Sequence, residues 1–168
     1  DTAILGIDYR PATGELIGLG NAGGVYAISD RNATATKKSQ LSVALTGTSF
    51  GVDFNPTVDR FRIVSDTGQN LRANVDTGAT LVDGTLSYAP PATASGITGA
   101  AYTNNDADVN TATTLFDLDS VMDQIVVQSP ANSGTLAPTG KLGVDTGAAV
   151  GFDIFSDTRN GTTVGVRA

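Results

Sequence analysis

The sequence has no cysteine, no histidine and no tryptophan, and each absence excludes a class of chemistry. Without cysteine there are no disulfides, thiolate metal sites or cysteine nucleophiles. Without histidine there is no Ser-His-Asp triad, no imidazole metal ligand and no imidazole general base. We therefore expect a protein that is not an enzyme. A hydrolase that works with carboxylates alone is the enzymatic alternative that stays open.

Charge is scarce as well, and it is mostly of one sign. Charged residues make up 16% of the chain, Glu15 is its one glutamate, and the net charge is −7 with a pI of about 4.2. Long helices draw on Glu, Lys and Arg together, so this composition predicts an all-β protein. An acidic surface also repels nucleic acid and anionic membranes, which we exclude as partners. No apolar run approaches the roughly 20 residues of a membrane span.

Small polar residues replace the missing charge. The chain is rich in Thr, Ser and Asn, and it contains 20 glycines. This composition, together with the lack of cysteine, is typical of secreted or cell-surface proteins of bacteria and archaea. The sequence begins at Asp1 rather than at a methionine, which we interpret as a processed mature form or an excised piece.

Comparison of the sequence with itself reveals a repeat of 45 residues. LGIDYRPATG at residues 5–14 aligns with FGVDFNPTVD at residues 50–59, which places Asp8 on Asp53. Apolar positions then match apolar positions and turn residues match turn residues: Ile7 with Val52, Tyr9 with Phe54, Pro11 with Pro56, Leu16 with Phe61, and Gly23 with Gly68. One gapless offset is rarely so consistent by chance.

Two further copies are shorter or less regular. The shared pattern is Gly-apolar-Asp-apolar, which returns at residues 151–154 and is altered at residues 99–102, where Ala101 replaces the aspartate. We therefore expect one domain over residues 1–168, with repeats at about 3–46, 47–96, 97–146 and a partial one at 147–168. The partial repeat is expected to hold two strands, at residues 149–156 and 162–166.

Each repeat has the size of a propeller blade. Short apolar runs alternate with clusters of Gly, Pro, Asn and Thr, which predicts four strands in about 45 residues. A β-propeller-like fold of four-stranded blades with an incomplete last blade is our prediction. A β-sandwich or a barrel, in which hairpins also recur at short intervals, is the alternative.

Several segments also resemble a known family. They are GTSFGVDFNPTVDRFRIVSDTGQNLR at residues 47–72, AYTN at 101–104, TLFDLD at 114–119, GTL at 134–136 and GVD at 143–145. Together they are similar to the bacterial family described as domain of unknown function 4394. The resemblance covers essentially the whole chain and implies a propeller-like fold and export. It implies no activity and no functional residues.

One loop carries a candidate metal site. Asp106, Asp108 and Asn110 alternate as do positions 1, 3 and 5 of a calcium-binding loop, and Asp117 falls at position 12. Thr111 stands where the sharp turn of that loop prefers glycine. Calcium is therefore the candidate ion, and a loop of Asx turns capped by its own side chains is the alternative.

The aspartates of the repeat are the second candidate group. Asp8, Asp53 and Asp153 could line a central channel and bind a metal ion or a substrate. We interpret them as structural instead, because a repeated aspartate at a strand end commonly anchors the following turn by accepting main-chain N–H groups.

Three functions remain, in the order in which we expect them. The first is an extracellular structural or interaction module that self-associates through an open β-edge, as a surface or filament subunit does. The second is a propeller that binds a carbohydrate or a peptide. The third is the carboxylate-dependent hydrolase.

Overall fold

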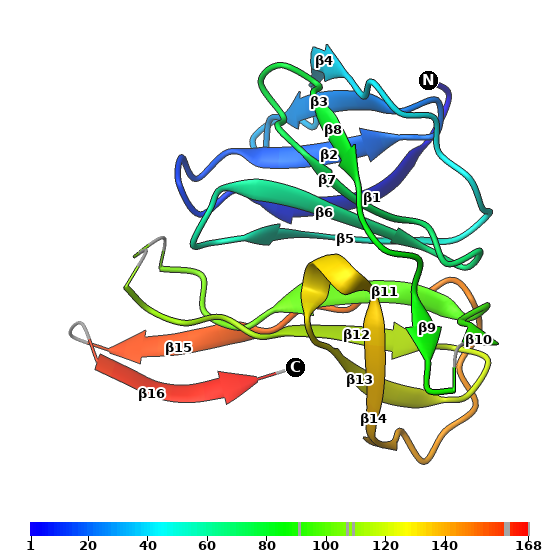
Figure 1. The fold of residues 1–168 in the computed structure, drawn as a ribbon. Coiled ribbons are helices and arrows are strands. Elements are labelled where there is room, and N and C mark those ends of the chain that lie inside the picture. The colour runs from blue at the N-terminus through cyan, green and yellow to red at the C-terminus, as the bar shows by residue number, and fades with distance from the viewer. Residues whose placement is uncertain (91, 107, 109, 160–161, 168) are drawn as a thin grey trace.

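The chain folds almost entirely into β-strands in a computed structural model that describes residues 1–90, 92–106, 108, 110–159 and 162–167. Figure 1 shows the strands stacked as successive sheets, with the first sheet at the top of the view. The one helical element among the described residues is a 3₁₀ turn at Ala131–Ser133. The prediction of an all-β protein is confirmed. No helix in this part of the chain has the length and hydrophobicity needed to cross a membrane.

The first two sheets have the same topology. Each is an antiparallel meander of four strands in sequence order. The first comprises β1 (Ile4–Tyr9), β2 (Leu16–Gly20), β3 (Gly24–Ile28) and β4 (Ala35–Gln40). The second comprises β5 (Phe50–Asn55), β6 (Arg60–Ser65), β7 (Asn70–Ala73) and β8 (Thr80–Val82). The β2–β3 and β6–β7 turns need a positive φ at equivalent positions, which Gly23 (80°) and Gly68 (85°) supply.

The third sheet is larger than the sequence predicts. Its four antiparallel strands are β11 (Ile97–Tyr102), β12 (Leu115–Asp119), β13 (Gln124–Gln128) and β14 (Thr135–Lys141). Two short strands from the preceding segment, β9 (Ser87–Tyr88) and β10 (Ala92–Thr93), extend it to six. The reason is that β9 pairs in parallel with β14, so the connection between the second and third sheets is itself part of a sheet.

The last repeat differs from the expectation in its first strand. The structure has β15 at Phe155–Arg159 and β16 at Thr162–Arg167, which form a separate two-stranded sheet. The strand expected over residues 149–156 is wrong in its position, because residues 151–154 form no ladder. This segment instead lies against β11, where Phe152 comes close to Gly99.

The sheets pack face to face through two apolar clusters. The first joins the first and second sheets and is built around Ile17, Leu19, Phe54, Phe61 and Ile63. The second lies between the second and third sheets and includes Val64, Ile97, Tyr102, Leu115 and Val126. Since burial of apolar surface is the main driving force for folding, these clusters fix the order in which the sheets stack.

Strand β5 lies between β1 and β11, and glycine makes the close approach to β11 possible. A Cβ atom placed on Gly51 would lie 2.5 Å from the main chain of Gly99 and Ala100. Real Cβ atoms do not approach main-chain atoms so closely, so a side chain at this position would push the two strands apart. The glycine of the repeat pattern is thus explained at Gly51 by the spacing between sheets.

Strand β6 has two different faces, and this difference positions the main site of the molecule. Phe61 and Ile63 point toward the first sheet and belong to its apolar cluster. Arg60 and Arg62 alternate with them and therefore point toward the third sheet. Arg72 stands directly opposite Arg62 on β7 and shares that face.

Candidate functional site

The aspartates of the first two repeats connect neighbouring sheets. Asp8 on β1 accepts a hydrogen bond from the main-chain N–H of Phe54 on β5, at 2.8 Å. Asp53 on β5 accepts one in the same way from the main-chain N–H of Tyr102 on β11. Each carboxylate therefore holds the following sheet, and this differs from the predicted anchoring of a turn in its own repeat. We call these two contacts the aspartate clamps.

The two clamp carboxyls also contact each other. Burial raises the pKa of Asp8 and raises the pKa of Asp53 well above its ordinary value, and the hydrogen bond between their side chains reinforces the rise at Asp53. The charge of Asp153 acts in the same direction on both. Two carboxylates in contact cannot both stay ionised without a large penalty, so the pair holds a proton more firmly than isolated aspartates do.

Asp153 reaches the same region from the last repeat but stays exposed. A cavity of about 390 Å³ is lined by all three aspartates, with Ile7, Val52 and Phe152 among its apolar walls. The structure thus brings Asp8, Asp53 and Asp153 to one place. Among the described residues, however, no three acidic side chains are close enough together to hold a metal ion.

The candidate calcium loop connects β11 to β12. Asp106 and Asp108 each accept a main-chain N–H two residues further on, from Asp108 and Asn110, at 2.8 and 2.9 Å. The main-chain N–H of Asp106 donates in turn to Asn104 Oδ1 at 3.3 Å. These contacts form consecutive Asx turns, the alternative considered for this segment. Ala107 and Val109 lie outside the described residues.

Asp117 is not part of this loop in space. It lies on β12 opposite Ala100 and is 0% exposed, whereas Asp106, Asp108 and Asn110 are all exposed. Neither carboxylate oxygen of Asp117 has a hydrogen-bond partner among the described residues. Burial raises its pKa well above the ordinary value, and the positive charge of Arg62 opposes this only in part. The structure therefore separates Asp117 from the other three predicted ligands.

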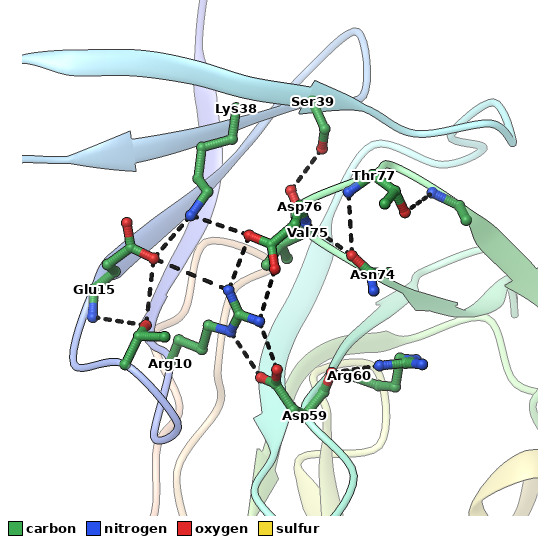
Figure 2. Close-up of polar contacts among 12 residues, drawn as sticks. Arg10, Glu15, Lys38, Ser39, Asp59, Arg60, Asn74, Val75, Asp76 and Thr77 are labelled. Carbon is green, nitrogen blue, oxygen red and sulfur yellow. Dashed lines mark hydrogen bonds and ion pairs between the residues drawn. The ribbon is translucent and has the colours of Figure 1, made fainter.

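A charged network ties the first sheet to the second and is shown in Figure 2. Arg10, which is 8% exposed, donates to both carboxylate oxygens of Asp59 and to both of Asp76, at 2.5–3.0 Å. Lys38 lies 2.8 Å from Glu15 and 3.2 Å from Asp76. Since every member of the network pairs with another member, it joins the sheets and leaves little capacity for a ligand.

A pocket of about 310 Å³ lies between the second and third sheets. Three arginines line it together with two asparagines, a tyrosine and a valine: Arg60, Arg62, Arg72, Asn55, Asn132, Tyr102 and Val58. The chain has only ten lysines and arginines, so nearly a third of its basic residues meet at this one concave surface. We call it the arginine pocket.

Arg62 forms the floor of the arginine pocket and is 2% exposed. Its guanidinium donates to Tyr102 Oη at 3.2 Å, to Asn70 and Asp83 at 2.7 Å, and to Asn132 at 2.9 Å. These partners come from the second sheet, the third sheet and the loops beside them. Arg62 therefore holds the walls of the pocket in place.

Arg72 and Arg60 each have guanidinium N–H groups that donate to no atom of the described residues. Arg72 makes a two-point contact with Asp83 through Nε and Nη2, at 2.6 and 2.9 Å, while its Nη1 donates to no atom of the described residues. Within the described part of the chain, Arg60 donates only from Nη1, to the carbonyls of Val58 and Asp59. The walls of the pocket thus carry guanidinium groups that are held in position but not fully paired.

The arginine pocket is not predicted from the sequence, although two signals for it are present. Arg60 and Arg62 alternate on one strand, so they share a face, and Arg72 follows ten positions later in an otherwise acidic chain. The remaining walls come from Tyr102 and Asn132, which are distant in the sequence. Only the packing of the third sheet on the second brings them in.

The family of the chain follows from its whole sequence. The model of the family described as domain of unknown function (DUF4394) matches residues 1–167. The chain belongs to this family. The resemblance seen in the sequence is thereby confirmed. No curated protein matches the chain.

Two solved structures are similar to part of this DUF4394 chain. An auxiliary nutrient binding protein from Bacteroides ovatus ATCC 8483 is similar with a TM-score of 0.50 and 14% identity, over 79% of this chain and 35% of its own. One from Bacteroides thetaiotaomicron VPI-5482 has a TM-score of 0.49 and 15% identity, over 79% of this chain and 34% of its own. The DUF4394 chain thus spans about a third of the length of these proteins.

Proposed function

We propose that this DUF4394 chain is a ligand-binding module, not an enzyme, and that its ligand occupies the arginine pocket. One observation carries the proposal: incompletely paired guanidinium groups of Arg60 and Arg72 face a concave cavity of about 310 Å³. Small-molecule sites are typically preformed cavities of roughly this size with a few fixed polar groups. Ligand binding was the second of the three functions expected from the sequence, and the arginine pocket favours it over the structural module that was expected first.

We propose further that the sheets are arranged as blades of a propeller. The two four-stranded meanders, their equivalent turns at Gly23 and Gly68, and the repeated aspartate clamps support this arrangement. In a propeller, neighbouring blades are arranged side by side around a central axis, so a pocket between two blades has walls from both. The arginine pocket has such a position between the second and third sheets.

Export to the cell surface or beyond is part of the proposal. It rests on the composition, which is poor in charge and free of cysteine, and on the family resemblance. The partly similar protein of Bacteroides ovatus is described as an auxiliary nutrient binding protein, which agrees with a binding role for this chain. Self-association through an open β-edge stays a prediction from the sequence, and so do the two alternatives for the loop between β11 and β12, a calcium site and a run of Asx turns.

A binding screen tests the proposed function. The purified protein is presented to arrays of neutral and acidic glycans and of short peptides, and each hit is measured by isothermal titration calorimetry. We expect at least one hit whose affinity falls tenfold or more in Arg60→Gln. Arg60 is suited to this test because, among the residues that the structure describes, its side chain bonds only to main-chain carbonyls of its own turn, so its replacement should leave the fold intact.

The matched control is Arg31→Gln, which removes the same charge from an exposed loop of the first sheet. This variant should bind like the wild type. Ligands that bind both variants equally well would place the binding site elsewhere, and a screen without any hit would contradict the proposed function.

A further inference from the structure

We infer that the arginine pocket selects ligands that carry a carboxylate group, of the size of an acidic monosaccharide unit. This inference rests on the proposed function and makes it more specific. It follows from the balance of hydrogen-bond donors and acceptors on the pocket walls, from the local charge, and from the way in which the arginines are held.

The open hydrogen-bonding groups of the pocket are almost all donors. Arg72 Nη1 donates to no described atom, and neither do Nε and Nη2 of Arg60. Asn55 and Asn132 each use Oδ1 as an acceptor, for Thr57 and Arg62 respectively, which leaves both Nδ2 groups without a partner among the described residues. A wall of donors is best matched by a group that only accepts, and an ionised carboxylate is such a group.

The charge of the site points in the same direction. Arg60, Arg62 and Arg72 bring three positive charges, and Asp83, which bonds to both Arg62 and Arg72, brings one negative charge. Two further acids lie next to Arg62: Asp117 faces it from the third sheet and Asp53 stands opposite it on β5, and burial favours the neutral form of both. The charge of Asp59, which precedes Arg60 in the chain, is balanced by Arg10. The pocket therefore keeps a positive excess inside a protein of net charge −7, and an anion that enters relieves it.

The arginines are also fixed in advance. Asp83 holds Arg72 through two bonds, which fix the plane of its guanidinium, and main-chain carbonyls anchor Arg60 through Nη1. A guanidinium whose plane is fixed loses little freedom when it binds, and its remaining edge matches the two oxygens of a planar carboxylate. The two asparagine amides can then donate to ring or hydroxyl oxygens of the same ligand.

Paired sugars that differ only at one carbon test the inference. We propose calorimetric titration with glucuronate against glucose and with galacturonate against galactose, at low ionic strength. Each acid should bind at least tenfold more tightly than its neutral partner. Added salt should weaken binding of the acids and leave binding of the neutral sugars unchanged.

Two pocket variants and one control complete the experiment. Arg60→Gln should remove most of the preference for acids, Arg72→Lys should reduce it because lysine cannot reproduce the fixed planar fork, and Arg31→Gln should retain it. Circular dichroism confirms that each variant is folded. Two arginine variants are used because Arg72 also supports Asp83, whereas Arg60 does not.

The outcomes separate the two proposals. Equal binding of acids and neutral sugars that is lost in Arg60→Gln would overturn the carboxylate inference and keep the binding function. The same holds if glucose 6-phosphate binds and neither uronate does. If the uronates bind the wild type and all three variants alike, the arginine pocket is not the site and both proposals fall.

Discussion

The carboxylate of Asp53 accepts a hydrogen bond from the main-chain N–H of Tyr102, 49 positions later in the chain. The equivalent residue Asp8 makes the same contact with Phe54. In both cases an inward aspartate of one sheet holds the strand that begins the next sheet. The donor is a main-chain N–H group, so the contact does not depend on which side chain the donor residue carries. The sequence can therefore vary at the donor position without loss of the clamp.

Replacement of Asp53 tests the clamp and its proton. Because burial raises the pKa of Asp53, the folded state holds its proton more firmly than the unfolded chain does. The contribution of Asp53 to the free energy of unfolding is fully present at acid pH, below the ordinary aspartate pKa near 4. It is lost as the pH rises through the raised pKa of the folded state. We expect Asp53→Asn to flatten this decline, because the amide keeps an acceptor for Tyr102 and a donor for Asp8. Urea unfolding between pH 4 and 8 measures it.

Asp53→Ala provides the contrast to the amide variant. It leaves the Tyr102 N–H and the Asp8 carboxyl without their partner, which should lower the free energy of unfolding by about 2 kcal/mol at pH 5. Equal stability of the alanine and asparagine variants would show that the clamp contributes nothing.

The spacing between sheets can be tested at Gly51. A methyl group there would meet the main chain of Gly99 and Ala100 at 2.5 Å, and strands β5 and β11 would have to separate. We expect Gly51→Ala to destabilise the fold by about 1–3 kcal/mol, as overpacking does. Gly147→Ala is the matched control, since no atom of the described residues lies within 4 Å of its added methyl group. Thermal unfolding of the two variants side by side would show whether the effect is specific.

Arg10 should matter far more for stability than its position at the edge of the first sheet suggests. Arg10→Gln removes the guanidinium that donates to Asp59 and Asp76 and leaves these part-buried carboxylates without its charge. We expect the free energy of unfolding to fall by about 2 kcal/mol. The pKa of Asp76, which hydrogen bonds from Arg10 hold below its ordinary value, should rise in this variant. NMR titration of that carboxyl measures the change. An unchanged pKa would mean that Lys38 alone holds Asp76.

Calcium titration decides between the two interpretations of the β11–β12 loop. The Asx turns of Asp106 and Asp108 need no cation, so we expect millimolar calcium to leave the melting temperature unchanged. Asp108→Ala should then lower stability equally with and without calcium, by about 1 kcal/mol or less. A melting temperature that rises with calcium in the wild type and not in Asp108→Ala would instead support the metal site.

Much of the strand pattern could be predicted because it depends on residues that are close together in the sequence. The apolar alternation and the turn residues predict four strands in a repeat, and each of the first two repeats does form a four-stranded meander. The addition of β9 to the third sheet could not be foreseen, since two residues have no periodicity of their own. The first strand of the last repeat was misplaced because Gly151-Phe-Asp-Ile154 matches the pattern in sequence but pairs with no strand.

The candidate site was predictable only in part. The repeat singled out Asp8, Asp53 and Asp153, and they do share one cavity. Tyr9, equivalent in the repeat to the buried Phe54, is 52% exposed, so equivalence in sequence did not ensure equal burial. The arginine pocket depends on which face of β6 meets the third sheet, and on Asn132, whose place is set by the turn after β13. Such contacts are decided by packing between repeats rather than by the pattern within one.

One edge strand of each of the three larger sheets, namely β4, β8 and β10, is poorly suited to pairing with another chain. β4 carries Lys37 and Lys38, β8 has three residues, and the third sheet ends on the two-residue strand β10. A short edge strand offers an approaching peptide few consecutive main-chain groups to pair with, and lysine side chains on an edge strand disfavour such pairing. Strand addition is therefore not expected to start at β4, β8 or β10, and self-association through an open β-edge would have to use another edge strand of these sheets.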